Sequence, residues 1–137
     1  MLTIKADLVQ QMTQHAQREH PLECCGVLAG KSNSDRAERC IEMRNAAASE
    51  TYFEYDSKQH FNVWREMDEN DEEPIVIYHS HTASIAYPSK TDILYANEPF
   101  AHFVIIPTNK DHGDAIRSFR IIENKITEET VSVVENY

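Results

Sequence analysis

Apolar residues recur along parts of the chain with the period of an amphipathic helix. Three segments carry this pattern or helix-start signals, namely residues 6–21, 57–70 and 88–99. In the second segment Phe61, Trp64 and Met67 are predicted to form one apolar stripe. Pro21 and Pro99 mark the expected ends of the first and third helices.

Shorter apolar runs, bounded by turn-forming residues, predict strands between these helices. The expected strands are residues 24–31, 39–45, 51–56, 74–81 and 101–108. The pattern over 115–135 predicts an antiparallel hairpin or meander. The chain has no internal repeat and no linker-like tract. We therefore expect residues 1–137 to form a single α+β domain, with one mixed central sheet flanked by helices.

Composition narrows the classes of function. Thirteen basic and twenty-three acidic residues give a formal net charge of −10, which disfavours binding to nucleic acid. No apolar run approaches the ~20 residues of a membrane span, and the N-terminus does not resemble a signal peptide. Cys24, Cys25 and Cys40 have no disulfide-framework spacing and predict reduced thiols, so a cytoplasmic location is expected.

Two histidines at the end of a predicted strand are candidate metal ligands. His79 and His81 are two residues apart, so their side chains leave the strand on the same face. Asp92 follows His81 after ten intervening residues, which leaves room for a loop and the first turn of a helix. Two nitrogens and one carboxylate oxygen leave a fourth tetrahedral position open, as a hydrolytic zinc site requires.

The same residues also have a purely local interpretation. Histidines at strand ends often hydrogen-bond to backbone, and "SKTD" places Ser89 as a helix N-cap with Asp92 at N3. Spacing alone favours neither interpretation over the other. The two roles are compatible, because Asp92 can point inward from the first helical turn.

A residue far upstream adds a second feature. Glu23 stands just before the Gly-containing segment "CCGVLAGK". Glu23, His79, His81, Ser89 and Asp92 occur in the order and spacing of the MPN/JAMM metallopeptidase family, which this chain resembles over essentially all 137 residues. The resemblance implies an MPN/JAMM (cytidine-deaminase-like) fold and one zinc ion per chain.

The resemblance also implies a role for each matched residue. His79, His81 and Asp92 would hold the zinc ion, and Glu23 would act as the general base. Ser89 would stabilise the oxyanion through its hydroxyl.

The loop after the second histidine indicates a subgroup. Thr82 stands where many family members have proline, and the chain lacks the long insertions of deubiquitinating members. "YHSHTASIAYPS" is similar to a bacterial subgroup that releases cysteine from a small ubiquitin-like sulfur-carrier protein of the CysO type, ending in Gly-Gly-Cys. An extended tail could add as a strand to a sheet edge beside the zinc. Thr82, Ser84 and Tyr87 are candidate substrate contacts.

Other functions remain as alternatives. The same chemistry could serve an isopeptidase acting on another ubiquitin-like conjugate, and a metal-free interaction scaffold is disfavoured because every ligand position is filled. A cysteine hydrolase using Cys24 or Cys25 is disfavoured because cysteines in apolar strands are usually inert, and the zinc-deaminase signature is missing. The remaining histidines are expected at the surface or in packing: His15, His20, His60, His102 and His112. For Tyr52, Phe53 and Tyr55, core packing is favoured over a groove role.

Overall fold

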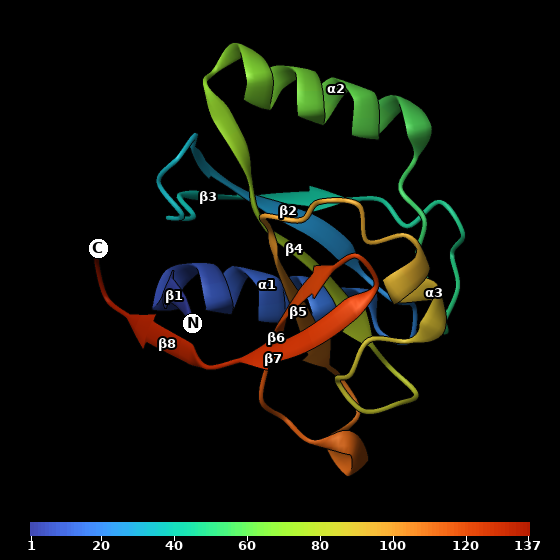
Figure 1. Cartoon of the computed structure of the whole chain (residues 1–137). Helices are drawn as coiled ribbons and strands as arrows, with labels where there is room; N and C mark the ends of the chain where they lie inside the picture. The colour runs from blue at the N-terminus through green and yellow to red at the C-terminus, as the bar shows by residue number, and fades with distance from the viewer.

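A six-stranded mixed sheet runs through the centre of the molecule, in the strand order β3-β2-β4-β5-β6-β7 (Figure 1). The structure, a computed structural model, describes residues 1–137. Its strands are β2 (Cys25–Lys31), β3 (Arg39–Met43), β4 (Glu72–His81), β5 (His102–Pro107), β6 (Arg117–Ile122) and β7 (Lys125–Glu129). Only the central pair β4 and β5 is parallel, and every other neighbouring pair is antiparallel.

Helices cover both faces of this sheet. Helix α1 (Ala6–Glu19) packs Leu8, Met12 and Ala16 against one face. On the other face lie α2 (Ser57–Glu69), which buries Met67, and the short α3 (Lys90–Leu94). A 3₁₀ turn, η1 (Lys110–His112), follows β5. None of these helices is long and apolar enough to cross a membrane.

Burial on both faces explains the uninterrupted apolar run "PIVIY" in the middle of β4. Val76 and Tyr78 belong to the cluster beneath α1, whereas Ile77 belongs to the cluster on the opposite face. The Tyr78 ring lies so close to β2 that a Cβ at Gly26 would be 2.3 Å from the Tyr78 hydroxyl. Only glycine fits at that position of the neighbouring strand.

The expectation of one mixed sheet is incomplete. The hairpin of β6 and β7 is confirmed, with Glu123 and Asn124 at positive φ in its turn. The chain then leaves this sheet, and β8 (Val131–Val134) pairs in parallel with β1 (Leu2–Lys5), a strand that the sequence analysis did not predict. Leu2 and Ile4 of β1 are buried in the same cluster as the apolar side chains of α1. This second sheet therefore covers apolar surface next to α1.

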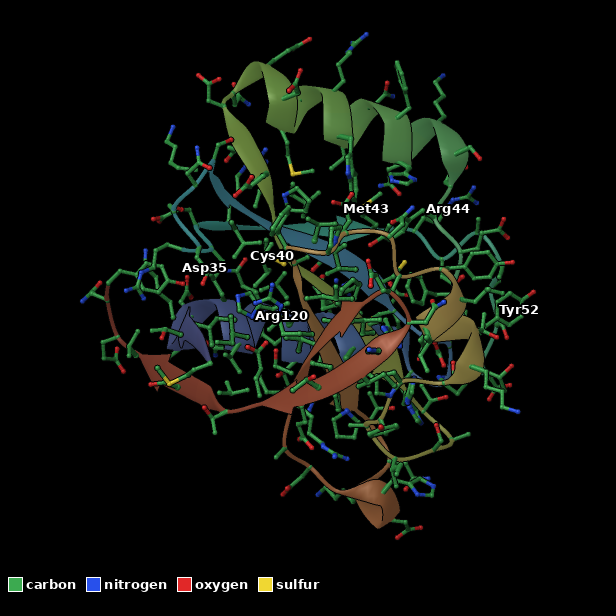
Figure 2. All side chains as sticks on the ribbon, in the orientation of Figure 1. Asp35, Cys40, Met43, Arg44, Tyr52 and Arg120 are labelled. Carbon is green, nitrogen blue, oxygen red and sulfur yellow. The ribbon has the colours of Figure 1, made fainter.

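The predicted strand at 51–56 is wrong. Only an isolated bridge between Asn45 and Tyr55 forms there, because the Asn45 side chain takes the backbone groups that a partner strand would need. Tyr52 therefore lies at the surface, with 45% of its area exposed (Figure 2).

Two helix details also differ from prediction. Phe61 is 64% exposed, whereas Met67 is 1% exposed. Phe61 and Met67 are six residues apart, and at about 100° per residue their side chains point about 120° apart around the helix. Residues chosen at every third position therefore do not all stay on the buried face. The third helix ends at Leu94 rather than at Pro99.

Candidate metal centre

His79, His81 and Asp92 meet at the C-terminal end of β4. The two imidazole Nε2 atoms are 3.1 Å apart, and each lies 3.1 Å from Asp92 Oδ2. All three side chains are buried, with at most 8% of their area exposed. The structure thus brings together the three residues whose spacing predicted a metal site.

The geometry of this triangle suits a small tetrahedral cation. Zinc–ligand distances of about 2.0–2.1 Å correspond to ligand–ligand edges of about 3.3 Å in a tetrahedron. The three observed edges of 3.1 Å are close to that value. The donor set, two imidazoles and one carboxylate, is a common zinc set, so the residues present fit the metal that the sequence predicts.

A hydrogen bond on the far side of one imidazole selects its tautomer. His81 Nδ1 donates to the Ile85 carbonyl oxygen at 2.7 Å, which leaves the Nε2 lone pair directed at the cluster. The His79 ring packs against the ring of Phe53, with centroids 4.7 Å apart. Both contacts fix ring orientation before any ion binds.

Asp92 is oriented by a helix cap. Ser89 Oγ accepts from Asp92 N at 3.1 Å, and Ser89 N donates to Asp92 Oδ2 at 2.8 Å, which completes a capping box. Burial alone would raise the pKa of Asp92, but the neighbouring histidines and the Ser89 backbone hold it below its usual range. The local capping interpretation is therefore correct, and it coexists with the convergence on His79 and His81.

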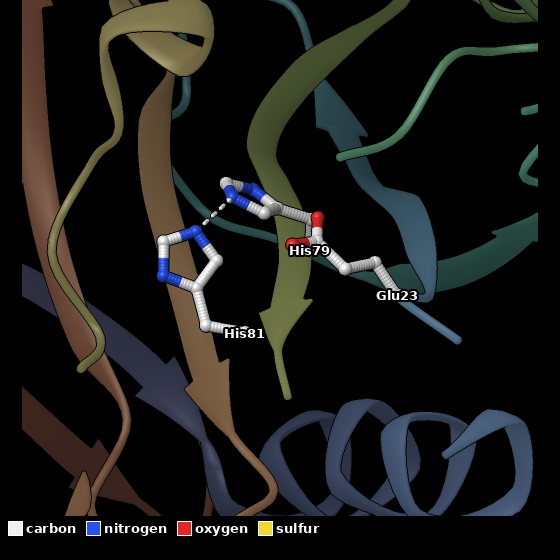
Figure 3. Close-up of side chains that lie close together, drawn as sticks. All are labelled: Glu23, His79 and His81. Carbon is white, nitrogen blue, oxygen red and sulfur yellow. Dashed lines mark hydrogen bonds between the residues drawn. The ribbon is translucent and has the colours of Figure 1, made fainter. Parts of the chain in front are cut away.

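Glu23 reaches the same cluster through strand register. β2 begins at Cys25, which lies opposite His79 on the antiparallel strand β4, so Glu23, two residues before Cys25, stands next to the end of β4 that carries the histidines. One ligand atom from each of Glu23, His79 and His81 lies within 4.8 Å of the others (Figure 3). These three residues form a candidate metal-binding cluster. Asp92 lies next to this cluster, 3.1 Å from the Nε2 atom of each imidazole.

The Glu23 carboxyl is buried without a hydrogen-bond partner for Oε1. The side chain is 3% exposed. Burial raises the pKa of Glu23 to about 8, with the Asp92 charge adding to the rise and His81 opposing it. A buried carboxyl that lacks a protein partner beside two imidazoles is typical of a group that meets a ligand or substrate.

The predicted substrate contacts are dispersed around the loop after β4. Thr82 is buried, and its hydroxyl donates to the Glu50 carbonyl oxygen at 2.9 Å. Ser84 Oγ lies 3.3 Å from His81 Nδ1. Tyr87 is 44% exposed and packs edge-on against Phe119. A role for any of them in substrate binding stays a prediction, as do the metal and catalytic roles above.

An aromatic groove of about 770 Å³ opens beside the candidate metal centre. His79 and Asp92 line it, together with Tyr52, Phe53, Tyr55, Trp64 and Tyr95. Sequence reasoning favoured core packing for the first three aromatic residues. Phe53 and Tyr55 do pack partly against the core, but they also form the groove wall. The available signal was the concentration of three aromatic rings in "TYFEY" just before a helix.

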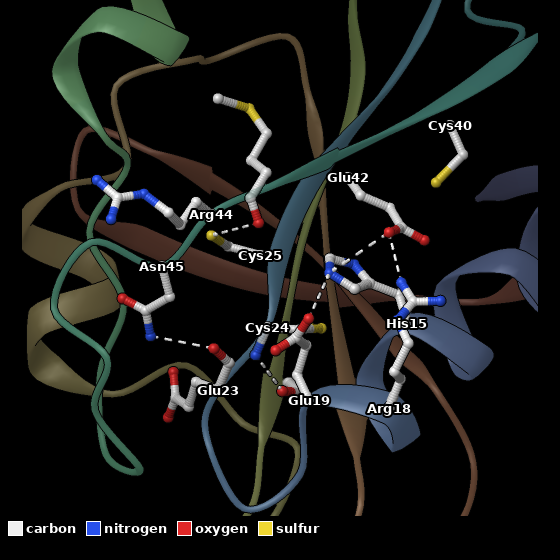
Figure 4. A network of polar contacts seen from close by, with 12 residues as sticks. His15, Arg18, Glu19, Glu23, Cys24, Cys25, Cys40, Glu42, Arg44 and Asn45 are labelled. Carbon is white, nitrogen blue, oxygen red and sulfur yellow. Dashed lines mark hydrogen bonds and ion pairs between the residues drawn. The ribbon is translucent and has the colours of Figure 1, made fainter.

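The cysteines, His15 and His102 have surroundings unlike those of reactive groups. Cys24 and Cys25 are buried, and burial raises the pKa of Cys24 to about 12 (Figure 4). Such thiols hold little thiolate near neutral pH, which disfavours a cysteine hydrolase. His15 bonds the buried Tyr78 hydroxyl at 2.8 Å, and His102 lies between Glu129 and Asp35.

Comparison with known proteins gives the family. The family described as prokaryotic homologs of the JAB domain matches residues 5–122. The chain belongs to this JAB family. A JAB1/MPN domain protein from Archaeoglobus fulgidus has the same fold, with a TM-score of 0.65 and 18% identity over 97% of this chain and 99% of that one. The predicted MPN/JAMM fold is thereby confirmed.

Two curated JAB relatives have named activities. The CysO-cysteine peptidase of Mycobacterium tuberculosis is 53% identical over all 137 residues of this chain and 94% of its own length. The desampylase of Haloferax volcanii is 27% identical over 115 residues, covering 80% of this chain and 83% of that protein.

Proposed function

We propose that this JAB protein is a zinc-dependent peptidase that releases cysteine from a carrier protein. Its substrate is a small ubiquitin-like sulfur-carrier protein of the CysO type, whose C-terminal Gly-Gly is joined by a peptide bond to cysteine. The full-length identity of 53% to a CysO-cysteine peptidase is the observation that carries this choice of substrate. The clustered His79, His81 and Asp92 support the choice of chemistry.

His79, His81 and Asp92 would hold the zinc ion. Zinc supplies Lewis-acid polarisation of the scissile carbonyl and lowers the pKa of water to about 7. The protein contributes ligand orientation, through the His81–Ile85 hydrogen bond and the Ser89–Asp92 capping box. It also excludes bulk water, because the ligand side chains are almost fully buried.

Glu23 would move the proton of the reaction. Its carboxylate takes a proton from the attacking water and passes it to the leaving amine of cysteine. In the metal-free protein, burial raises the pKa of Glu23 to about 8. A carboxyl group beside the metal can accept the proton in one step and donate it in the next.

Ser89 would donate a hydrogen bond to the carbonyl oxygen as negative charge develops there. In the capping box Ser89 Oγ acts only as an acceptor, from Asp92 N. Its own proton is left over, and the side chain is exposed beside the metal centre. The cap uses the hydroxyl oxygen of Ser89 as an acceptor, whereas the catalytic role would use the hydroxyl proton as a donor.

The carrier tail would lie in the aromatic groove. β4 is hydrogen-bonded to a neighbour on both sides, so no open sheet edge adjoins His79, and the expected strand addition at an edge there is not supported. The groove instead offers Tyr52, Phe53 and Tyr55 as a wall leading to the metal centre. A flexible tail of small residues suits such a passage because bulky side chains would meet the aromatic rings.

A JAB deconjugase acting on another ubiquitin-like protein is the second candidate. The similarity to a desampylase favours it, although that match is lower in identity and coverage. Both candidates use the same metal and base, so the substrate distinguishes them. A free cysteine leaving group would identify the first, and a lysine-linked protein leaving group would identify the second.

The test is to incubate the zinc-loaded protein with carrier proteins of two kinds. One ends in Gly-Gly-Cys, and the other is joined through its Gly-Gly end to a lysine side chain. Mass spectrometry should show loss of one cysteine from the first. Cleavage of only the lysine-linked conjugate would reject the proposed substrate but retain the chemistry, and a protein that binds no zinc would reject both.

The first mutational prediction concerns Glu23. Glu23→Gln should retain zinc and lower kcat at least about 100-fold, since an amide cannot take the proton. The matched control is Glu135→Gln, the same change at an exposed position, which should leave kcat unaltered. Normal turnover by Glu23→Gln would show that another group is the base.

A further inference from the structure

One loop holds the backbone of Glu23 on both sides. We call residues 45–55 the Asn45 loop. Glu23 precedes β2, so its peptide groups lie outside the sheet ladder. Its N–H donates to the Ser49 carbonyl oxygen at 2.9 Å, and its carbonyl oxygen accepts from Asn45 Nδ2 at 3.0 Å (Figure 4). Both backbone anchors of Glu23 therefore come from this loop.

The Asn45 side chain is the centre of the loop. Besides Glu23 O, its Nδ2 donates to Tyr52 O at 3.1 Å. Its Oδ1 accepts from Ala47 N at 3.0 Å and from Glu54 N at 3.1 Å. A side-chain amide has two donor hydrogens and two acceptor lone pairs, so all four are used. Three of the bonds shape the loop, and the fourth reaches outside it to Glu23.

The same loop contacts the metal centre and the groove. Phe53 packs against the His79 ring, and the Glu50 carbonyl oxygen accepts from Thr82 next to His81. Tyr52, Phe53 and Tyr55 form a wall of the groove. The Asn45 loop thus contacts the backbone of Glu23, the candidate ligand His79 and the aromatic groove together.

We infer that Asn45 is a positioning residue that sets the place of the Glu23 carboxyl relative to His79 and His81. It acts through the Glu23 carbonyl oxygen and does not touch substrate. Glu23 Oε1 has no hydrogen-bond partner in the protein, so the backbone anchors decide where the carboxyl stands. This inference rests on the proposed function, because it matters only where Glu23 transfers a proton.

The test is Asn45→Asp in the zinc-loaded full chain, with release of cysteine from a carrier protein ending in Gly-Gly-Cys as the assay. Aspartate keeps the acceptor for Ala47 N and Glu54 N but cannot donate to Glu23 O or to Tyr52 O. We expect kcat to fall about 10- to 100-fold, since small misplacements of a reacting group have effects of this size. KM should stay within about threefold of wild type, and zinc content should be unchanged. Asn62→Asp, the same change at an exposed position of α2, is the control and should leave both constants unaltered.

A double mutant separates positioning from general loosening. In the Glu23→Gln background, Asn45→Asp should cause no further loss, because the group that it positions no longer transfers a proton. Additive losses would overturn the inference, as would an unchanged kcat in Asn45→Asp. Asn45→Ser, whose hydroxyl is too short to reach Glu23 O, provides a second variant. Loss of zinc or of the folded state in both variants would assign Asn45 a merely structural role and overturn the inference.

The two proposals fail in distinguishable ways. If wild-type protein loaded with zinc does not release cysteine from the carrier, the proposed function fails, and the inference falls with it. If wild type is active and Asn45→Asp matches it, only the inference fails.

Discussion

At the scale of single residues, the candidate metal centre depends on atoms that serve two purposes. Asp92 Oδ2 accepts from Ser89 N and faces both imidazoles, so one oxygen belongs to a helix cap and to the candidate ligand set. His81 uses one ring nitrogen for the backbone of Ile85 and the other for the cluster. Local hydrogen bonds thus pre-orient the groups that the site needs.

Ser89→Ala tests the cap at this scale. The substitution removes the acceptor for Asp92 N, and we expect the free energy of unfolding of the metal-free protein to fall by about 1 kcal/mol. Urea unfolding followed by circular dichroism measures the change. Ser89→Thr keeps a hydroxyl and should retain most of the stability. An unchanged midpoint in Ser89→Ala would mean that the cap contributes nothing to the fold.

At the scale of elements, each face of the sheet is covered by a different helix, and only the inward side chains of those helices carry stability. On α2, Met67 enters a cluster with Cys25, Val27 and Ala29. Phe61, six residues earlier, remains outside it and contacts Arg65. The prediction gave the extent of the helix within one residue, but it placed Phe61 on the buried face, where the structure has Met67 without Phe61.

Met67→Ala and Phe61→Ala form a matched pair for this element. Truncating the 1% exposed Met67 should lower the free energy of unfolding by about 2–5 kcal/mol, because it leaves a cavity against β2. Truncating the 64% exposed Phe61 should change it by less than about 0.5 kcal/mol. Chemical denaturation of both variants checks the ranking. The reverse order would mean that α2 packs through the face carrying Phe61.

At the scale of the whole molecule, an ionic cluster around the buried His102 and Glu129 connects segments far apart in the chain. His102 on β5 bonds Glu129 at 2.6 Å and Asp35 at 2.8 Å, and Glu129 also receives Ser118 Oγ and the N-terminal ammonium. Burial opposes ionisation of Glu129, but these partners outweigh it and lower the pKa to about 2. The pKa of His102 is raised because its two carboxylate partners outweigh burial.

These shifts predict a pH window of highest stability. Because the pKa of Glu129 is lowered from 4.5 to about 2 on folding, Glu129 stabilises the fold fully at pH values above 4.5. This contribution is lost as the pH falls toward about 2. The raised pKa of His102 contributes fully below 6.5 and is lost as pH rises through its folded value. The cluster therefore stabilises most between these values. Urea midpoints of metal-free wild type and Glu129→Gln across pH should differ most in that window, and a constant difference would contradict the prediction.

The sequence alone determined the features that depend on short-range periodicity. The spacing of His79 and His81 places both on one face of a strand, and "SKTD" specifies a capped helix start that carries Asp92. The apolar run before His79 indicated a buried strand. With the matched Glu23 and Ser89, these local patterns were enough to identify the family and to nominate the five site residues.

Only the tertiary structure decided how distant segments meet. The register of β2 against β4 sets Cys25 opposite His79, which brings Glu23 close to two histidines more than fifty residues away. The pairing of β1 with β8 and the four hydrogen bonds of Asn45 likewise depend on partners outside any local window. Propensity could not exclude a strand at 51–56, because its backbone groups are taken by a side chain rather than by a neighbouring strand. Local sequence specifies which groups are available, and long-range packing selects their partners.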